Sequence, residues 1–169
     1  MIYNPYHIRR QFLLFLHIAA HILCSGCSTS SAPHVTSGQQ PVLPMLLFQK
    51  TPCFGTCPAY NATIYTDGSA SYVPYEHALA QDTLQLQLTV PELQQLRSRI
   101  EVLKYNGLQS SYLSSWSDIS STYLTFYENG KEVKRVKHQK GGPQELLALK
   151  TWLGELLEQR AQEKSTPAQ

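Results

Sequence analysis

The residues of this chain best suited to covalent chemistry are its four cysteines, which fall into two groups. Cys24 and Cys27 lie near the N-terminus, and the other two end the segment Cys53-Phe-Gly-Thr-Cys57. Cysteines at this spacing can form a disulfide if the chain between them turns tightly, which Gly55 permits. In an oxidising compartment we therefore expect a Cys53–Cys57 disulfide, whose loop closure contributes about 2 kcal/mol to stability.

The same pair of cysteines leaves two alternatives open. Soft thiolates bind Cu(I), and C-x-x-x-C-P resembles the copper-binding element of thioredoxin-like copper chaperones. In those proteins the element lies between a strand and a helix, whereas here it leads into a strand. A redox pair that exchanges its disulfide is the second alternative, although the C-x-x-C spacing of redox motifs is absent. Nothing in the sequence brings His77 or His138 close to the cysteines, so we assign no cofactor and no metal ligands.

A hydrolytic site built from Asp118, His138 and a serine is a further alternative. The G-x-S-x-G element that would support it is absent. His138 belongs to the basic segment 131–140, which is more simply a solvated strand, and Asp118 more simply caps or braces its loop. We therefore assign no catalytic residue, and the sequence does not favour an enzyme.

The N-terminal segment has the parts of an export signal. Arg9 and Arg10 form a positive flank, and the apolar residues 12–23 are fewer than the roughly 20 that a membrane-spanning helix needs. Leu23-Cys-Ser-Gly-Cys27 then resembles the lipobox of bacterial lipoprotein signal peptides, whose last cysteine is lipidated and becomes the new N-terminus. The resemblance implies a signal peptide over 1–26 and a lipid on Cys27. An ordinary secretory signal or an uncleaved anchor is the alternative.

The rest of the chain divides by composition. Residues 27–43 are rich in Ser, Pro, Gly and Gln without apolar periodicity, which predicts a flexible tether. A single domain is expected over 44–162, followed by a disordered tail over 163–169. Arg9 and Arg10 account for two of the 14 Lys and Arg residues, which leaves 12 against 12 Asp and Glu. A domain this close to neutrality is not expected to bind nucleic acid.

Strand patterns occupy most of the first half of the domain and recur near its end. Short apolar or alternating runs predict strands over 44–50, 60–65, 69–75, 82–88 and 122–127. Asn129-Gly130 predicts a two-residue hairpin loop into a further strand. This register places Leu124 opposite Arg135 and turns Val136 to the other face, a conflict that a bulge near Lys134 would resolve.

Two helices complete the predicted fold. Thr89 and Glu92 form a capping box that starts the first helix, and Gly107 is expected to end it. Residues 108–121 are polar and are expected to form a loop. A second helix is predicted from about Pro143, with a stripe of leucines on its buried side. The predicted fold class is α+β, with one mostly antiparallel sheet of about five strands and two helices packed on one face.

The element C-x-G-x-C-P-x-Y, followed by Asp67-Gly68, resembles the domain of unknown function family numbered 6438. That family carries this element before a strand, often in bacterial envelope lipoproteins. The resemblance covers roughly residues 45–160, and the family has no established activity. It implies a functional role for the positions that match its pattern, which are Gly55, Pro58, Tyr60, Asp118 and His138.

These observations predict a lipid-anchored domain of the bacterial cell envelope, expected at the outer membrane, with a non-enzymatic binding or structural role. The lipid would hold it to the membrane, and its partner would be an envelope protein or a component of the cell wall. The binding surface is expected on the sheet or on the 108–121 loop. The basic segment 131–140 could dock an acidic partner.

Overall fold

The computed structural model describes residues 41–116 and 118–166 of the chain. The predicted signal peptide over 1–26, the lipidation of Cys27 and most of the predicted tether lie outside the described residues. Among the described residues, no helix is long and apolar enough to cross a membrane.

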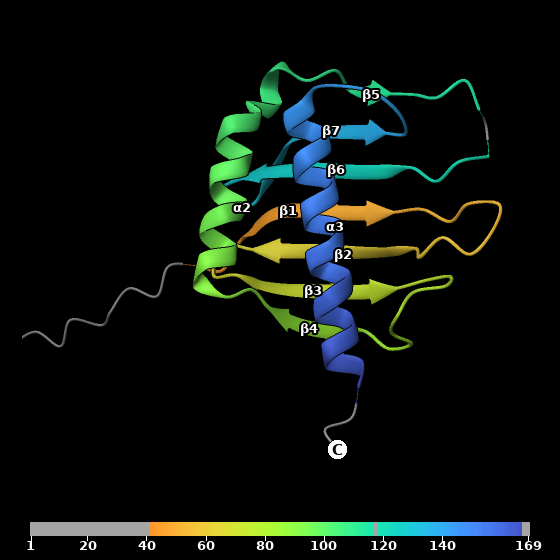
Figure 1. Ribbon diagram of the computed structural model, residues 1–169. Coiled ribbons are helices and arrows are strands. Elements are labelled where there is room, and N and C mark those ends of the chain that lie inside the picture. The colour runs from red at the N-terminus through yellow and green to blue at the C-terminus, as the bar shows by residue number, and fades with distance from the viewer. Residues whose placement is uncertain (1–40, 117, 167–169) are drawn as a thin grey trace, which may run out of the picture. The chain divides into compact units, whose positions relative to one another are not determined.

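One sheet contains all seven strands of the described chain, in the order β4-β3-β2-β1-β6-β7-β5 (Figure 1). All neighbouring strands pair antiparallel except β5 and β7, which are parallel. The strands are β1 (Pro44–Lys50), β2 (Tyr60–Tyr65), β3 (Ser69–Pro74), β4 (Leu84–Gln87), β5 (Ser111–Tyr112), β6 (Thr122–Glu128) and β7 (Lys131–His138).

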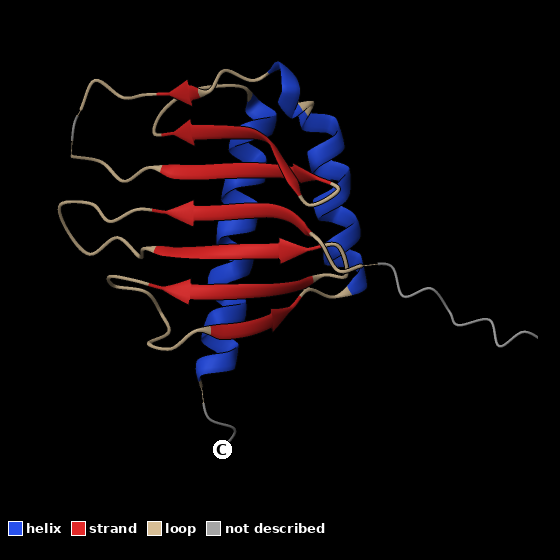
Figure 2. Ribbon diagram, turned by 180° about the vertical axis from the view of Figure 1, so that it is seen from behind, coloured by secondary structure: helices blue, strands red, loops and turns tan. Residues whose placement is uncertain are grey.

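Two long helices, α2 (Val90–Leu103) and α3 (Gln144–Ser165), lie on the same face of this sheet. Of the part of the chain that the structure describes, no helix lies on the opposite face, as the view from behind shows (Figure 2). The predicted α+β class, the mostly antiparallel sheet and the position of the helices are confirmed. The sheet has more strands than the predicted five, in part because β5 is a two-residue strand within the segment expected to be loop.

The start of α2 follows the prediction, but its end does not. The Thr89 side chain accepts a hydrogen bond from the Glu92 backbone N–H, and the Glu92 carboxylate accepts one from the Thr89 N–H. The helix ends at Leu103, where Lys104 takes a left-handed conformation with φ of 48°. Gly107 is therefore not the residue that ends α2; it closes a short 3-10 helix, η1 (Tyr105–Gly107).

The second helix begins after Pro143, as predicted, and continues to Ser165. It therefore includes residues 163–165, which the sequence analysis assigned to the tail. Its buried side packs against the sheet and consists largely of leucines: Leu146, Leu149, Leu153, Leu156 and Leu157.

The β6–β7 hairpin contains the predicted bulge. Asn129 and Gly130 both have positive φ, at 51° and 77°, which is the backbone that a tight two-residue hairpin loop requires. The register shifts between Phe126, which pairs with Lys134, and the next pair, Tyr127 with Glu132. Val133 is the extra residue and is 41% exposed. The shift returns Val136 to the core opposite Leu124.

Three of the strand connections lie at one end of the sheet, at the right of Figure 1. They are the β1–β2 loop (residues 51–59), the β3–β4 loop (75–83) and the β5–β6 loop (113–121). We call this the loop end. The chain enters β1 at the opposite end of the sheet, at Pro44.

We predict that Gly68→Ala destabilises the domain, because Gly68 turns the chain between β2 and β3 with φ of +84°. A Cβ there would also lie 3.2 Å from the side chains of Gln87 and Leu93. The expected loss is about 1 to 2 kcal/mol in the free energy of unfolding, measured by urea denaturation. Gly107→Ala is the matched control, since Gly107 has no positive φ and a Cβ there meets no atom within 4 Å. Equal effects of the two substitutions would contradict this explanation.

Candidate functional site

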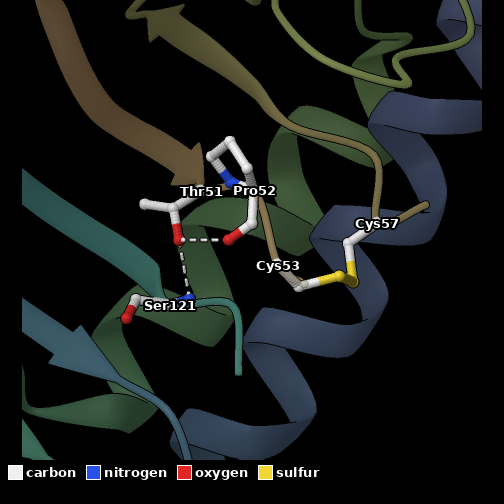
Figure 3. Close-up of a disulfide and its surroundings, with 5 residues drawn as sticks. All are labelled: Thr51, Pro52, Cys53, Cys57 and Ser121. Atoms are coloured by element: carbon white, nitrogen blue, oxygen red, sulfur yellow. Dashed lines mark hydrogen bonds between the residues drawn. A yellow bond between two sulfur atoms is a disulfide. The ribbon is translucent and has the colours of Figure 1, made fainter. Parts of the chain in front are cut away.

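Cys53 and Cys57 are joined by a disulfide, with their Cα atoms 5.7 Å apart (Figure 3). Gly55 donates its backbone N–H to the Cys53 carbonyl at 2.8 Å, which closes a tight turn inside the ring. Gly55 does not have a positive φ, and a Cβ there would lie 3.7 Å from the Cys53 sulfur. Because both sulfurs are in the disulfide, neither is available as a thiolate ligand for Cu(I).

The disulfide loop presents a large apolar side chain to solvent. Phe54 is 96% exposed, although both neighbouring cysteines are half-buried. The short covalent ring restricts the backbone at this position, so Phe54 projects from a constrained loop. Phe54 was not among the residues predicted to be functional, although its place between the two cysteines could have indicated it.

A pair of hydrogen bonds links the base of the disulfide loop to the β5–β6 loop. The Thr51 N–H donates to the Ser121 carbonyl at 2.9 Å, and the Ser121 N–H donates to the Thr51 hydroxyl at 2.8 Å (Figure 3). Gln139, just after β7, donates to the Ser121 hydroxyl and accepts from the Ser114 N–H. These contacts fix both ends of the β5–β6 loop to the sheet.

The β3–β4 loop is joined to the disulfide loop by its backbone. The Ala59 N–H donates to the Glu76 carbonyl and the Tyr75 N–H donates to the Ala59 carbonyl, both at 2.9 Å. Pro58 lies half-buried between the disulfide and this connection. The three loops therefore form one hydrogen-bonded surface.

Exposed apolar side chains are concentrated on this surface. Six of the ten large exposed apolar residues of the described chain belong to the three loops, and we call them the apolar loop set. They are Phe54 (96% exposed), Trp116 (73%), Leu113 (59%), Tyr75 (57%), Leu79 (47%) and Ile119 (38%). Asp118, which the sequence analysis proposed as functional, lies beside Ile119 in the same β5–β6 loop.

A row of polar side chains crosses the sheet beneath α3, next to the loop end. Lys50 pairs with Tyr60 on one side and with Thr122 on the other, and Thr122 pairs with His138. Directly paired residues project from the same face of a sheet, and here it is the face that the helices cover. Tyr60 and His138, two of the predicted functional positions, therefore belong to one row.

Lys50, Tyr60 and Glu158 of α3 form the centre of this row. The Lys50 ammonium lies 2.6 Å from the Glu158 carboxylate and 5.6 Å from the centre of the Tyr60 ring. The Tyr60 hydroxyl donates to Glu158 at 3.4 Å. Burial, reinforced by the negative charge of Glu158, raises the pKa of Tyr60 far above its ordinary range. The phenol therefore stays neutral and acts as a hydrogen-bond donor.

His138 is almost completely buried, at 2% exposure. Its Nε2–H donates to the Gly141 carbonyl at 2.8 Å, and its Nδ1 has no hydrogen-bond partner among the described residues. Burial lowers the pKa of His138 below its ordinary value of 6.5, and the nearby Lys150 ammonium acts in the same direction. The Gly141 bond opposes these effects. His138 is thus a neutral, buried imidazole that anchors the turn leading into α3.

A cavity of about 280 Å³ opens between this row and α3. Lys150, Ser120 and Thr122 are among the residues that line it. Lys50, Lys150 and Glu158 were not predicted from sequence, because a charged residue on a strand or helix does not reveal whether it is partly buried beside a cavity. Within residues 41–116 and 118–166, no group of three or more His, Cys, Asp or Glu side chains is placed to hold a metal ion.

We predict that burial of His138 makes the stability of the domain depend on pH. The folded-state pKa lies below 6.5, so the unfolded chain binds more protons as the pH falls through this value, and stability decreases. Above pH 6.5 the free energy of unfolding contains the full contribution of neutral His138. Below pH 6.5 this free energy falls by at most about 1.4 kcal/mol per pH unit. His138→Gln should flatten the change in unfolding free energy measured between pH 7.5 and 5.5. His77→Asn, at an exposed position, should leave it unchanged; the same flattening in both variants would refute the assignment.

Comparison with known proteins identifies the domain to which this site belongs. A family model described as "Domain of unknown function (DUF6438)" matches residues 44–157. No curated protein and no solved structure matches the chain. The matched region contains the C-x-G-x-C-P-x-Y element and every predicted functional position after the leader. Since the match spans more than half of the chain, the protein belongs to the DUF6438 family.

Proposed function

We propose that this protein is a lipid-anchored domain of the bacterial cell envelope that binds a partner protein through its loop end, without catalysing a reaction. The apolar loop set is the observation that carries the binding proposal. Isolated apolar residues are normal on protein surfaces, but apolar side chains gathered on one surface indicate an interaction site.

The bracing of the loops supports a binding role for Phe54. Binding sites gain much of their affinity from a few aromatic anchors, and ordering a flexible loop would subtract from that affinity. The disulfide and the Thr51–Ser121 hydrogen bonds hold the base of the loop before any partner arrives. Phe54 and Trp116 therefore have the character of pre-organised anchors.

The charges around the loop set favour a protein over an anionic lipid surface. The β3–β4 and β5–β6 loops contain Glu76, Asp82 and Asp118, whereas Lys140 is the charged residue of the adjacent β7–α3 turn. The formal sum is three negative charges and one positive, or −2. Such a surface is repelled by anionic headgroups and complements a partner whose apolar pocket has a basic rim.

Two further features support the proposal. The described chain enters the sheet at the end opposite to the loops (Figure 1), so the upstream segment joins the domain away from the loop end. His138 is buried and its Nε2–H is bound to Gly141. An imidazole held in this way does not offer solvent a general base, which supports a non-enzymatic role.

The binding proposal predicts a position-specific contact in the native envelope. A photo-crosslinking phenylalanine analogue at position 54 or 116 of the full-length chain should give one discrete protein adduct, identified by mass spectrometry. The matched control is position 102, because Val102 is 62% exposed but lies on α2. Trp116→Ala should reduce the adduct from position 54 by at least about tenfold, as expected for an anchor worth about 1.4 kcal/mol or more. Adducts to lipid alone, or equal labelling from position 102, would overturn the proposal.

The anchoring proposal predicts a lipid on one particular cysteine. In a bacterial host that processes lipoproteins, an alkyne-tagged fatty acid should label the wild-type chain and the Cys24→Ser variant equally. Cys27→Ser should abolish the label and leave the protein with its leader uncleaved, as seen from its mass. Labelling that survives Cys27→Ser would refute the assignment of Cys27.

A further inference from the structure

The helix-free face of the sheet carries two cations next to one aromatic ring. The Arg135 guanidinium lies 4.7 Å from the centre of the Tyr123 ring, and the Lys137 ammonium lies 5.8 Å from it. Both cations belong to β7 and Tyr123 belongs to the adjacent β6. Strand alternation places them opposite to the helix-covered row, on the face that Figure 2 turns toward the reader.

Hydrogen bonds between side chains extend this group across the sheet. Arg135 donates to the Gln49 side-chain oxygen at 3.2 Å, and Gln49 donates to the Asn61 side-chain oxygen at 2.9 Å. Asn61 in turn donates to the Tyr75 hydroxyl at 2.9 Å. Together with Tyr123 and Lys137, these residues form a continuous polar row over β7, β6, β1 and β2, which we call the open-face row.

Neither cation of the open-face row forms an ion pair within the described chain, and Glu132 is the acidic residue of β7 on the same face. The ion pairs of that part of the chain are Lys50–Glu158, Arg160–Glu92 and Arg160–Glu163, and none includes Arg135 or Lys137. Contact with an aromatic ring orients a guanidinium but does not neutralise its charge. Arg135 is exposed, so its remaining donors can form the paired hydrogen bonds that carboxylates accept from arginine.

We propose that the open-face row binds an anionic polysaccharide, with Arg135 and Lys137 contacting its carboxylates. The amides of Gln49 and Asn61 and the phenol of Tyr75 can exchange hydrogen bonds with sugar hydroxyls, which both donate and accept. The row crosses the middle of the sheet, whereas an extended peptide is typically bound by pairing with an edge strand. The geometry therefore favours a saccharide over an acidic peptide. This surface shares Tyr75 with the apolar loop set, but the proposal rests on Arg135 and Lys137 and does not depend on partner binding by that set.

The test compares three polymers on the full mature chain in lipid nanodiscs, by isothermal titration calorimetry at low salt. Polygalacturonate should bind at least about tenfold more tightly than neutral dextran and than polyglutamate. The double substitution Arg135→Gln with Lys137→Gln should weaken the binding of polygalacturonate by at least about tenfold. The control, Lys131→Gln with Lys164→Gln, makes the same change in net charge at other positions and should retain wild-type affinity.

A single substitution, Arg135→Lys, provides a second measurement in a variant that keeps the charge. It should bind polygalacturonate several-fold more weakly, because an ammonium cannot form the paired hydrogen bonds of a guanidinium. If the wild-type chain bound polyglutamate as tightly as polygalacturonate, charge alone would be recognised and the saccharide proposal would be overturned. An equal loss of polygalacturonate affinity in the Lys131/Lys164 control variant would overturn the assignment of the site. So would a wild-type chain that does not bind polygalacturonate.

Discussion

Both helices lie on one face of the sheet, and this one-sided packing determines what each strand residue can do. Side chains alternate between faces along a strand. In β1, Leu46 and Phe48 are therefore buried under the helices, whereas Leu47 and Gln49 project to the open face. The same alternation separates Val136 and His138 from Arg135 and Lys137 in β7. The buried core, the polar row beneath α3 and the cationic open face are all consequences of this arrangement.

The polar row shows how the domain accommodates charge next to its core. A fully buried ion pair often costs more in lost hydration than it gains from attraction. Lys50 and Glu158 avoid most of this cost, because their side chains remain 24% and 27% exposed at the edge of α3. Their attraction is correspondingly modest, and its main effect is positional. It fixes α3 over the end of β1, from which the disulfide loop starts.

The features that could be predicted from sequence are those whose partners are close along the chain. The Thr89–Glu92 capping box, the Asn129-Gly130 turn and the bulge beside it each depend on residues within about ten positions. One local prediction that failed was the end of α2. Gly107 was expected there because glycine adopts a left-handed conformation at no steric cost, but Lys104 adopts it instead.

The contacts of the site residues could not be predicted, because their partners are far apart along the chain. Lys50 and Glu158 are 108 positions apart, and Arg135 and Gln49 are 86 apart. Such contacts arise from strand order and helix placement, which composition and periodicity do not specify. The family element pointed to Cys53, Cys57 and Tyr60 but not to Phe54, because C-x-G-x-C leaves that position unspecified and only its place between the cysteines could have indicated it. A role for Tyr60 could be anticipated, but not its bond to Glu158.

The separation of charge and apolar surface on the domain supports the two proposed contacts, each with a different kind of molecule. After the leader, acidic and basic residues are equal in number, so no net field draws the domain to a charged partner. Locally, however, Glu76, Asp82 and Asp118 surround the apolar loop set, and Arg135 and Lys137 stand on the open face without acidic partners among the described residues. A domain with a purely structural role would gain stability by burying Phe54 and by placing carboxylates beside Arg135 and Lys137. The exposure of these three side chains is accounted for if other molecules provide those contacts, as proposed above.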